Sequence, residues 1–265
     1  MILFVAWPTA NVPRSNKAAR RWMEAGYKVA VATDLPRHAV RGIDASVPPL
    51  LIEKWEGYYN CMNFMARALC AQFRADIVVC AGDGIAPDPL RRGHDMAITF
   101  AAKFPSGFGA MQPVKGMWKP SASGGRAQPG MSDARRWLHA TPATNQRCES
   151  PWLGRRFILE ARQEGPYSGK YGQYFGDVEL FRAAQRLGAL WLRDDVEQPS
   201  QHWAQAGGPE QAPYQAANYD RHYEKDYAMF RAREHAGFPD DAPPVPAGAN
   251  GQAAEPRRII LPGEF

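Results

Sequence analysis

The chain lacks the short motifs that mark the most familiar nucleotide and hydrolase sites. No GxGxxG follows the first predicted strand, and no GxxxxGK[ST] occurs anywhere. Dinucleotide binding and P-loop chemistry are therefore poorly supported. HExxH and GxSxG are absent too, which argues against the usual zinc-protease and nucleophile-elbow sites. The chemistry must come from carboxylates and a histidine at the ends of predicted elements.

Cysteines are few, and apolar runs of membrane length are missing. The four cysteines show no CxxC spacing, which predicts a reduced, cytoplasmic protein without a disulfide framework. No apolar run approaches a bilayer span. The opening Met1–Trp7 stretch has no basic leader and is followed by Pro8, so we expect neither a signal peptide nor a membrane partner.

Size and charge favour one domain with an anionic ligand. At 265 residues and 29.4 kDa the chain can bury one sizeable core. Its 32 Lys and Arg against 27 Asp and Glu give a net charge of +5 and a pI near 9.1. Such a balance suits nucleotide diphosphates and nucleic acid. The plainer interpretation, that the charge only aids solubility, is equally compatible.

The first ninety residues alternate strand-like and helix-like patterns. Apolar runs predict strands, and apolar positions at helical spacing predict helices between them. The predicted strands are 2–7, 27–33, 50–52 and 77–81, and the predicted helices are 15–25, capped by Ser15, and 60–73. This order is typical of an α/β fold with a mostly parallel sheet.

The rest of the chain is less regular. Residues 114–149 hold many Gly, Pro and Ser, which is typical of a functional loop or a disordered insertion. Further on we expect a strand at 109–113, a strand or helix start at 157–161, a helix from Leu180, a strand at 189–192 and a helix at 219–235. Residues 239–265 are rich in Pro, Ala and Gly and predict a flexible tail.

A carboxylate follows the most apolar predicted strand. Residues 77–81 are rich in β-branched side chains and too short for a helix, as in strands buried on both faces. A Gly-Asp-Gly turn centred on Asp83 comes next. Because ligands bind at the carboxyl ends of strands in open α/β sheets, Asp83 is a candidate site residue. Alternatively, it only forms a turn before Gly84.

These residues resemble a GT-A-fold glycosyltransferase of the family-2 kind. Such enzymes carry Asp-x-Asp after a buried strand and then a proline; here Ala81-Gly82-Asp83 and Pro87 keep the last acid and lack the first. They also place Glu-Asp at a helix start, then a glycine, a strand and a histidine. Gly176-Asp177-Val178-Glu179-Leu180, Gly188, Leu190–Leu192 and His202 keep that order, with Gly176 in place of the glutamate.

The resemblance covers residues 1 to 205 and implies a fold, domains and site residues. It implies a GT-A-like single domain at 1–205, with a nucleotide-binding half at 1–90 and an acceptor half at 91–205. A helical extension at 206–238 and the tail at 239–265 would follow. Asp177 would be the catalytic base, and Asp83 and His202 the metal ligands, with Asp88 as partial compensation. The donor would meet Pro8, Thr9, Asn11, Asp34, Asn63, Arg67, Gly82 and Asp83, and the acceptor Trp152, Gly154, Arg155 and Gly176.

The implied reaction is sugar transfer from a nucleotide-sugar donor, most simply a UDP-sugar. A hard divalent ion, Mn²⁺ or Mg²⁺, would stabilise the diphosphate leaving group. A carboxylate at a helix start is well placed to take the acceptor's proton, and one displacement would invert the anomeric centre. Soluble transferases of this style resemble those of bacteriophages that glycosylate hydroxylated bases of their own DNA, so DNA is a candidate acceptor.

Several alternatives stay open. The same fold class and metal would serve a nucleotidyltransferase. The stretch at 114–149, which carries Arg126, Arg135, Arg136 and Arg147, would serve a non-catalytic nucleic-acid-binding protein. Asp177 could be only a helix cap, Asp34 an ordinary strand end, His202 a histidine without a role, and Trp152 a packed aromatic. The sequence leaves the sugar and the oligomeric state open.

Overall fold

A seven-stranded sheet organises the chain. The computed structural model describes residues 1–34, 42–44, 46–47, 49–52, 55–115, 147–199 and 211–239. Its strands are β1 (Leu3–Pro8), β2 (Lys28–Thr33), β3 (Pro49–Leu51), β4 (Ile77–Cys80), β5 (Ala110–Lys115), β6 (Trp152–Gly154) and β7 (Leu190–Glu197). They lie in the order β3-β2-β1-β4-β6-β5-β7. All neighbours pair in parallel except β6, which is antiparallel to both β4 and β5.

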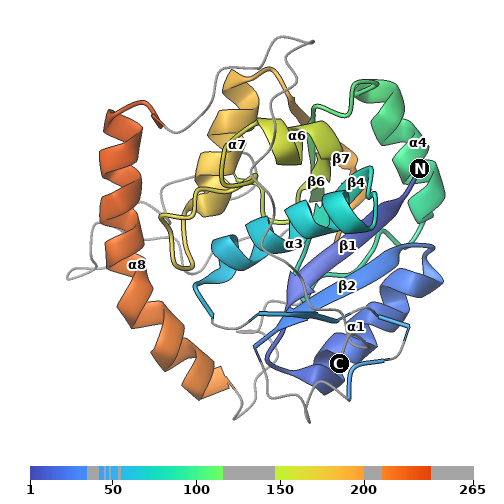
Figure 1. Cartoon of the computed structure of the whole chain (residues 1–265), viewed down its shortest axis with the longest axis horizontal. Helices are drawn as coiled ribbons and strands as arrows, with labels where there is room; N and C mark the ends of the chain where they lie inside the picture. The colour runs from blue at the N-terminus through green and yellow to red at the C-terminus, as the bar shows by residue number, and fades with distance from the viewer. Residues whose placement is uncertain are drawn as a thin grey trace.

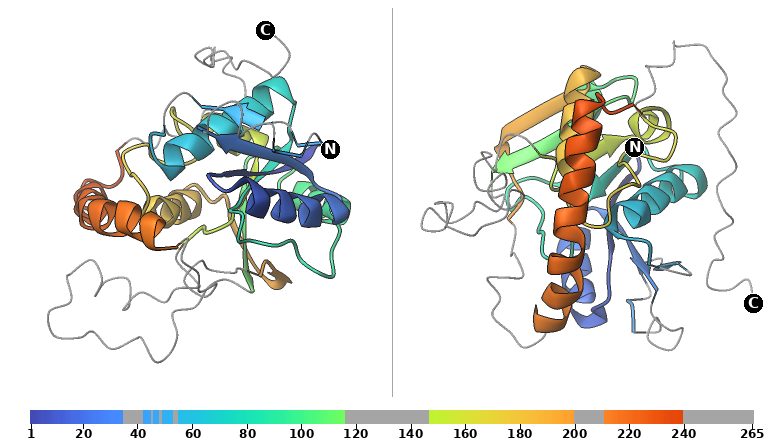
Figure 2. Two further views of the ribbon diagram at one scale, coloured as in Figure 1. Left: turned by 90° about the horizontal axis from the view of Figure 1, so that it is seen from below. Right: turned by 90° about the vertical axis from the view of Figure 1, so that its left-hand side faces the viewer.

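Helices cover both faces of the sheet (Figures 1 and 2). On one face lie α1 (Val12–Glu24) and α4 (Gly93–Lys103), whose Trp22 and Phe100 pack with Val5 and Val79. On the other lie α3 (Tyr58–Gln72), α6 (Arg155–Glu160), α7 (Gly176–Arg186) and α8 (Gln211–His235). Alternate residues of β1 and β4 therefore enter two separate cores, as expected for strands buried on both sides.

The last helix is fastened to α7 by a buried ionic cluster. Glu179 of α7 accepts hydrogen bonds from Arg233 of α8 at 2.8 and 2.9 Å, and its Oε1 lies 2.8 Å from Arg162 Nη1. In α8, Asp226 accepts from the backbone amides of Gly172, Gln173 and Tyr174, at 2.8 to 3.0 Å. These contacts place α8 along the outer side of α7 (Figure 1).

The predicted fold class, α/β with a mostly parallel sheet and helices on both faces, is confirmed. One local prediction was wrong, and so was one of the alternatives left open. Asn11, not Ser15, caps α1, since its side chain accepts from Arg14 N at 3.1 Å. The buried Ser15 hydroxyl instead accepts from Trp7 Nε1 at 2.9 Å. Asp177 is not a cap either, because Phe175 occupies the N-cap of α7.

Other predicted elements begin or end near the observed bounds, and some predictions concern residues that the structure does not describe. The segment at 157–161 is the helix α6, which begins at Arg155, and the strand expected at 189–192 runs on to Glu197. Residues 116–146 and 240–265 lie outside the described residues, so the loop and tail predictions stay predictions, as do the domain boundaries. None of the described helices is long and apolar enough to cross a bilayer.

Candidate active site

The candidate site lies at the carboxyl edge of the sheet, where β1, β2 and β4 end. The chain continues there into Thr9, Asp34 and Asp83 respectively. Since β6 runs antiparallel to β4, its beginning lies at the same edge, and Cys80 N donates to Pro151 O at 2.9 Å. Segments far apart in the sequence therefore meet at this edge, where open α/β sheets bind ligands.

Asp83 forms an ion pair with Arg14 of α1. Arg14 Nε lies 3.2 Å from Asp83 Oδ1, with the side chains 36% and 26% exposed. Burial raises the pKa of the Asp83 carboxyl above its usual value, and the Arg14 charge only partly opposes this. The turn before α1 is fixed locally, since Thr9 Oγ1 accepts from Asn11 N at 3.0 Å. The turn therefore positions the start of α1 so that the Arg14 guanidinium lies beside Asp83, on the predicted donor side.

Asp177 lies in the first turn of α7 and contacts α3. Tyr59 donates its hydroxyl to Asp177 Oδ1 at 3.2 Å, and Val178 N donates to the same oxygen at 3.0 Å. Gly176 permits the close approach, because a Cβ there would lie 2.7 Å from the Tyr59 ring. This explains a glycine where the resembled family has a glutamate.

Two consecutive tyrosines of α3 join the predicted acids. Tyr58 donates its hydroxyl to Ala81 O at 3.1 Å, two residues before Asp83, while Tyr59 reaches Asp177. Cys148 N also donates to Asp177 O at 3.0 Å, which ties the start of α7 to the segment leading into β6. Helix α3 thus contacts both segments, while Asp83 pairs with α1 on one face of the sheet and Asp177 with α3 on the other.

A third acid, Glu149, belongs to this region and was missed from the sequence. Burial raises the pKa of its carboxyl to about 7; Arg147 lowers it, and the negative charge of Asp177 raises it. The sequence signal was weak, because Glu149 ends an irregular stretch and fits no motif. Only its position one residue before the buried Ser150-Pro151-Trp152 segment could have suggested it.

Two predicted acceptor residues lie at the opposite edge. Gly154 pairs with Ile77, the first residue of β4, and Arg155 N donates to Asp76 O at 2.9 Å. Since β4 has four residues, about 13 Å of strand separates them from the carboxyl edge. The structure therefore does not bring Gly154 and Arg155 to Asp83 and Asp177.

Trp152 is not available for stacking on a ligand in this structure. Its ring is 1% exposed and packs edge-on against Tyr27, with centroids 5.6 Å apart. Gly176 is thus the one predicted acceptor residue among the four that the structure sets beside Asp177.

The remaining predicted donor residues have mixed surroundings. Pro8, Thr9 and Gly82 flank the edge itself, and Asp34 is exposed there. Asn63 is buried and uses both ends of its carboxamide on the backbone of Tyr167, each at 2.8 Å. Arg67 donates to Gln163 O at 3.0 Å. Asn63 and Arg67 therefore serve to hold the 163–167 loop against α3.

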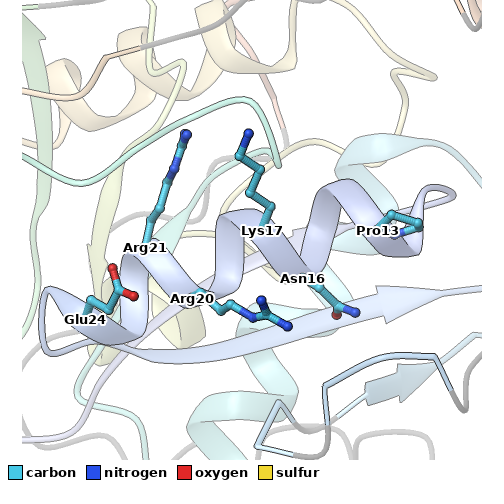
Figure 3. A pocket seen from close by; sticks show the side chains of 6 residues that line it. All are labelled: Pro13, Asn16, Lys17, Arg20, Arg21 and Glu24. Carbon is cyan, nitrogen blue, oxygen red and sulfur yellow. The ribbon is translucent and has the colours of Figure 1, made fainter.

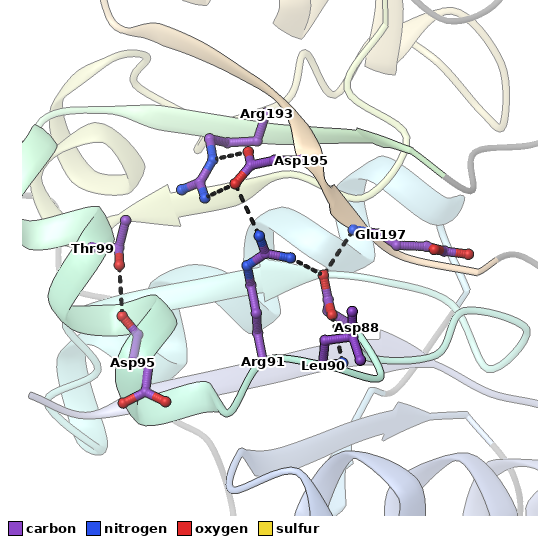
Figure 4. Close-up of polar contacts among 8 residues, drawn as sticks. All are labelled: Asp88, Leu90, Arg91, Asp95, Thr99, Arg193, Asp195 and Glu197. Atoms are coloured by element: carbon purple, nitrogen blue, oxygen red, sulfur yellow. Dashed lines mark hydrogen bonds and ion pairs between the residues drawn. The ribbon is translucent and has the colours of Figure 1, made fainter.

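The described residues do not supply a complete set of metal ligands. His202 lies outside them, and they include no group of three His, Cys, Asp or Glu side chains that could hold an ion. Asp88, the suggested compensating acid, is 5% exposed and accepts from Leu90 N, Glu197 N and Arg91 at 2.7 to 3.0 Å (Figure 4). The described residues do not by themselves fit a metal centre.

A shallow groove lies on the outer side of α1 (Figure 3). It is lined by Pro13, Asn16, Lys17, Arg20, Arg21 and Glu24, and none of the three acids above contributes to it. Arg20 is paired with Asp44 at 3.9 Å. The groove is a basic surface beside the edge rather than the site itself.

No protein-family model and no curated protein sequence matches the chain. Among solved structures, mannosyl-3-phosphoglycerate synthase from Rubrobacter xylanophilus is similar with a TM-score of 0.52 and 12% identity, over 99% of this chain and 86% of that one. The catalytic domain of Drosophila β1,4-galactosyltransferase 7, in complex with xylobiose, gives a TM-score of 0.44 and 10% identity, over 74% and 67%. At these identities the similarity concerns the fold, which is GT-A-like.

Proposed function

We propose that this GT-A-like chain is a glycosyltransferase, which moves a hexosyl or pentosyl group from a nucleotide-sugar donor to an acceptor hydroxyl. What supports the proposal is that two acids follow segments which one helix, α3, connects: Asp83 comes after the end of β4, and Asp177 lies in the first turn of α7. The tyrosine pair Tyr58 and Tyr59 contacts both segments. Two acids from distant segments at a ligand-binding edge suit a two-substrate reaction.

On the donor side, the guanidinium of Arg14 supports binding of a diphosphate. Guanidinium groups bind phosphate oxygens with charge-assisted, often bidentate hydrogen bonds. Arg14 lies in the first turn of α1, whose amino end also favours negative charge. A UDP-sugar is the simplest donor, with its diphosphate at Arg14 and its nucleoside towards Thr9 and Asp34.

On the acceptor side, Asp177 supports proton removal. The acceptor oxygen would attack the anomeric carbon as the bond to the diphosphate breaks, and its proton would pass to a carboxylate. The Tyr59 hydroxyl and Val178 N both donate to Oδ1 of Asp177, which orients the carboxylate. A single displacement of this kind inverts the anomeric centre.

A divalent ion, Mn²⁺ or Mg²⁺, is part of the proposal as a prediction. Such an ion would supply Lewis-acid stabilisation of the leaving group, with Asp83 as one ligand and His202 as the predicted second. Because the described residues alone do not form the site, no step is assigned to the ion. Turnover with and without EDTA, followed by Mn²⁺ add-back, tests it.

DNA as the acceptor is the finer part of the proposal. Its support is the basic side of α1, where Lys17, Arg20 and Arg21 line the groove that begins at Pro13, next to Arg14. Phosphate contacts of this kind release counterions, so DNA affinity should fall steeply with salt. A flipped-out base or a single strand would be needed for the hydroxyl to reach Asp177. Salt-insensitive or absent DNA binding would remove this acceptor.

The test is a donor screen that detects nucleotide release by mass, run on the wild type, Asp83→Ala, Asp177→Asn and the control Asp95→Asn. Asp95 is an exposed acid in the first turn of α4. We expect UDP release from a UDP-sugar in the wild type and the control, and loss in both site variants with the fold kept. Turnover of nucleoside triphosphates instead would favour a nucleotidyltransferase. DNA binding that survives in both site variants, without turnover, would favour a binding protein.

A further inference from the structure

Glu149 is held in place from both sides. Before it, Cys148 N donates to the Asp177 carbonyl at 3.0 Å, and after it, Ser150 N donates to Gln112 Oε1 at 3.2 Å. Gln112 belongs to β5 and is fully buried. The backbone at Glu149 is thus fixed between the start of α7 and Gln112 of β5, and its carboxyl lies near enough to Asp177 for that charge to raise its pKa.

The Glu149 carboxylate has an unusual polar environment. Its Oε2 is buried and has no hydrogen-bond partner in the part of the chain that the structure describes. A buried acceptor oxygen without a donor is costly, so the arrangement suits either a proton on the carboxyl or a hydroxyl from a ligand. A carboxylate that takes a proton from a ligand hydroxyl during turnover would meet that hydroxyl first and carry the proton afterwards.

The charges around Glu149 favour proton exchange near neutral pH. The groups that face it or its neighbour Asp177 are Arg147, which stabilises the anion, Asp177, which destabilises it, and the neutral Tyr59 and Cys148. The resulting pKa of about 7 is the value at which a general base is both available and effective. Two neighbouring acids whose environments differ in this way are typical of acid–base sites.

We infer that Glu149 is a second carboxylate of the acceptor site and that it receives the proton of the acceptor hydroxyl, while Asp177 orients that hydroxyl. This inference rests on the proposed glycosyl transfer. In the step, the acceptor oxygen forms its bond to the anomeric carbon and the carbon–oxygen bond to the diphosphate breaks. The electron pair leaves with the diphosphate, and the hydroxyl proton passes to the Glu149 carboxylate.

The proton-binding part is tested without any substrate. Full-length chain labelled with ¹³C at the glutamate side-chain carboxyl is titrated by NMR, and Glu149→Gln identifies the signal. We expect a midpoint near 7, which falls in Asp177→Asn because a neighbouring negative charge is removed. A midpoint in the ordinary range of glutamate, about 4 to 5, or one that Asp177→Asn leaves unchanged, overturns the inference.

The catalytic part is tested by UDP release from the UDP-sugar that the donor screen selects, with water as acceptor. Glu149→Gln should lower kcat about 100-fold or more, change the donor KM less than twofold, and remove the rise of kcat with pH near 7. The matched control is Glu224→Gln, at an exposed position of α8. Full kcat with the same pH dependence in Glu149→Gln overturns the inference and leaves the proposed function standing. A wild type without turnover would count against the proposed function, and the titration then decides the role of Glu149.

Discussion

Two acids of α7, Asp177 and Glu179, stand two residues apart and have opposite surroundings. Glu179 is fully buried and accepts from Arg233 and Tyr171, with Arg162 2.8 Å away. Burial alone would raise the pKa of Glu179, but these donors together hold it below its usual value. Asp177 is half-buried and has Tyr59 and its own helix as hydrogen-bond donors.

The comparison separates an acid that holds the fold from one for which we propose a role in chemistry. Every neighbour of Glu179 is part of the link among α7, α8 and the loop after α6. Asp177 lies instead beside the segment that leads into β6, where Cys148 N donates to its carbonyl and its charge acts on Glu149. Proximity in the sequence therefore says little about role, which depends on whether the surroundings already satisfy the charge.

The largest expected effect comes from removing the acid that holds the fold. Glu179→Ala leaves Arg162 and Arg233, 4% and 8% exposed at the side chain, without their anion. We expect the free energy of unfolding to fall by about 3–5 kcal/mol, measured by urea denaturation. Glu224→Gln, on the exposed side of α8, should change it by no more than about 0.5 kcal/mol. If both variants changed the free energy of unfolding by the same small amount, Glu179 would not be an acid that holds the fold.

Glu149 should give a stability effect that depends on pH. Its folded-state pKa of about 7 lies above the usual 4.5, so the folded chain holds a proton that the unfolded chain has lost between these values. The contribution of Glu149 to the free energy of unfolding is therefore fully present below pH 4.5 and is lost as the pH rises through 7. The loss amounts to roughly 3 kcal/mol at most. Glu149→Gln, which cannot ionise, should exceed the wild type in stability above pH 7 and approach the wild-type pH trend below 4.5. Parallel curves from pH 4 to 9 would contradict this.

A second anchoring acid, Asp226, sharpens the comparison on α8. It is 1% exposed and accepts from three successive backbone amides at 172–174. Asp226→Ala should lower the free energy of unfolding by about 1–3 kcal/mol, because buried donors lose their acceptor. Hydrogen exchange should accelerate first at those three amides. Unchanged exchange there would show that Asp226 does not fasten the loop.

The smallest stability effect is expected at the proposed site. Asp177→Asn keeps the shape of the side chain, so the free energy of unfolding should change by about 1 kcal/mol or less. UDP release should nevertheless fall about 100-fold or more, as expected when the carboxylate that orients the acceptor hydroxyl is lost. A variant that loses stability as Glu179→Ala does, with activity lost only in proportion to unfolding, would make Asp177 a second structural acid.

The buried strands were predictable because a short, continuous run of β-branched and apolar residues is rare outside strands that are covered on both faces. The sequence also pointed to Asp83 and Asp177, each at the end of a regular element. It misplaced Gly154 and Arg155 because an apolar run carries no information on strand direction, and β6 runs antiparallel to β4. The roles of Asn63 and Asp88 were hidden because most of their partners, at Tyr167, Leu90 and Glu197, are backbone groups, which leave no mark on a sequence pattern.

Glycosyl transfer at this site requires one ligand to touch both sides of the carboxyl edge, and a crystal structure with a bound, unreactive UDP-sugar analogue tests this most directly. We predict the diphosphate within hydrogen-bonding distance of Arg14 and the anomeric carbon between Asp83 and Asp177. An analogue bound elsewhere, for instance along the outer side of α1, with both acids left without contact, would contradict the account.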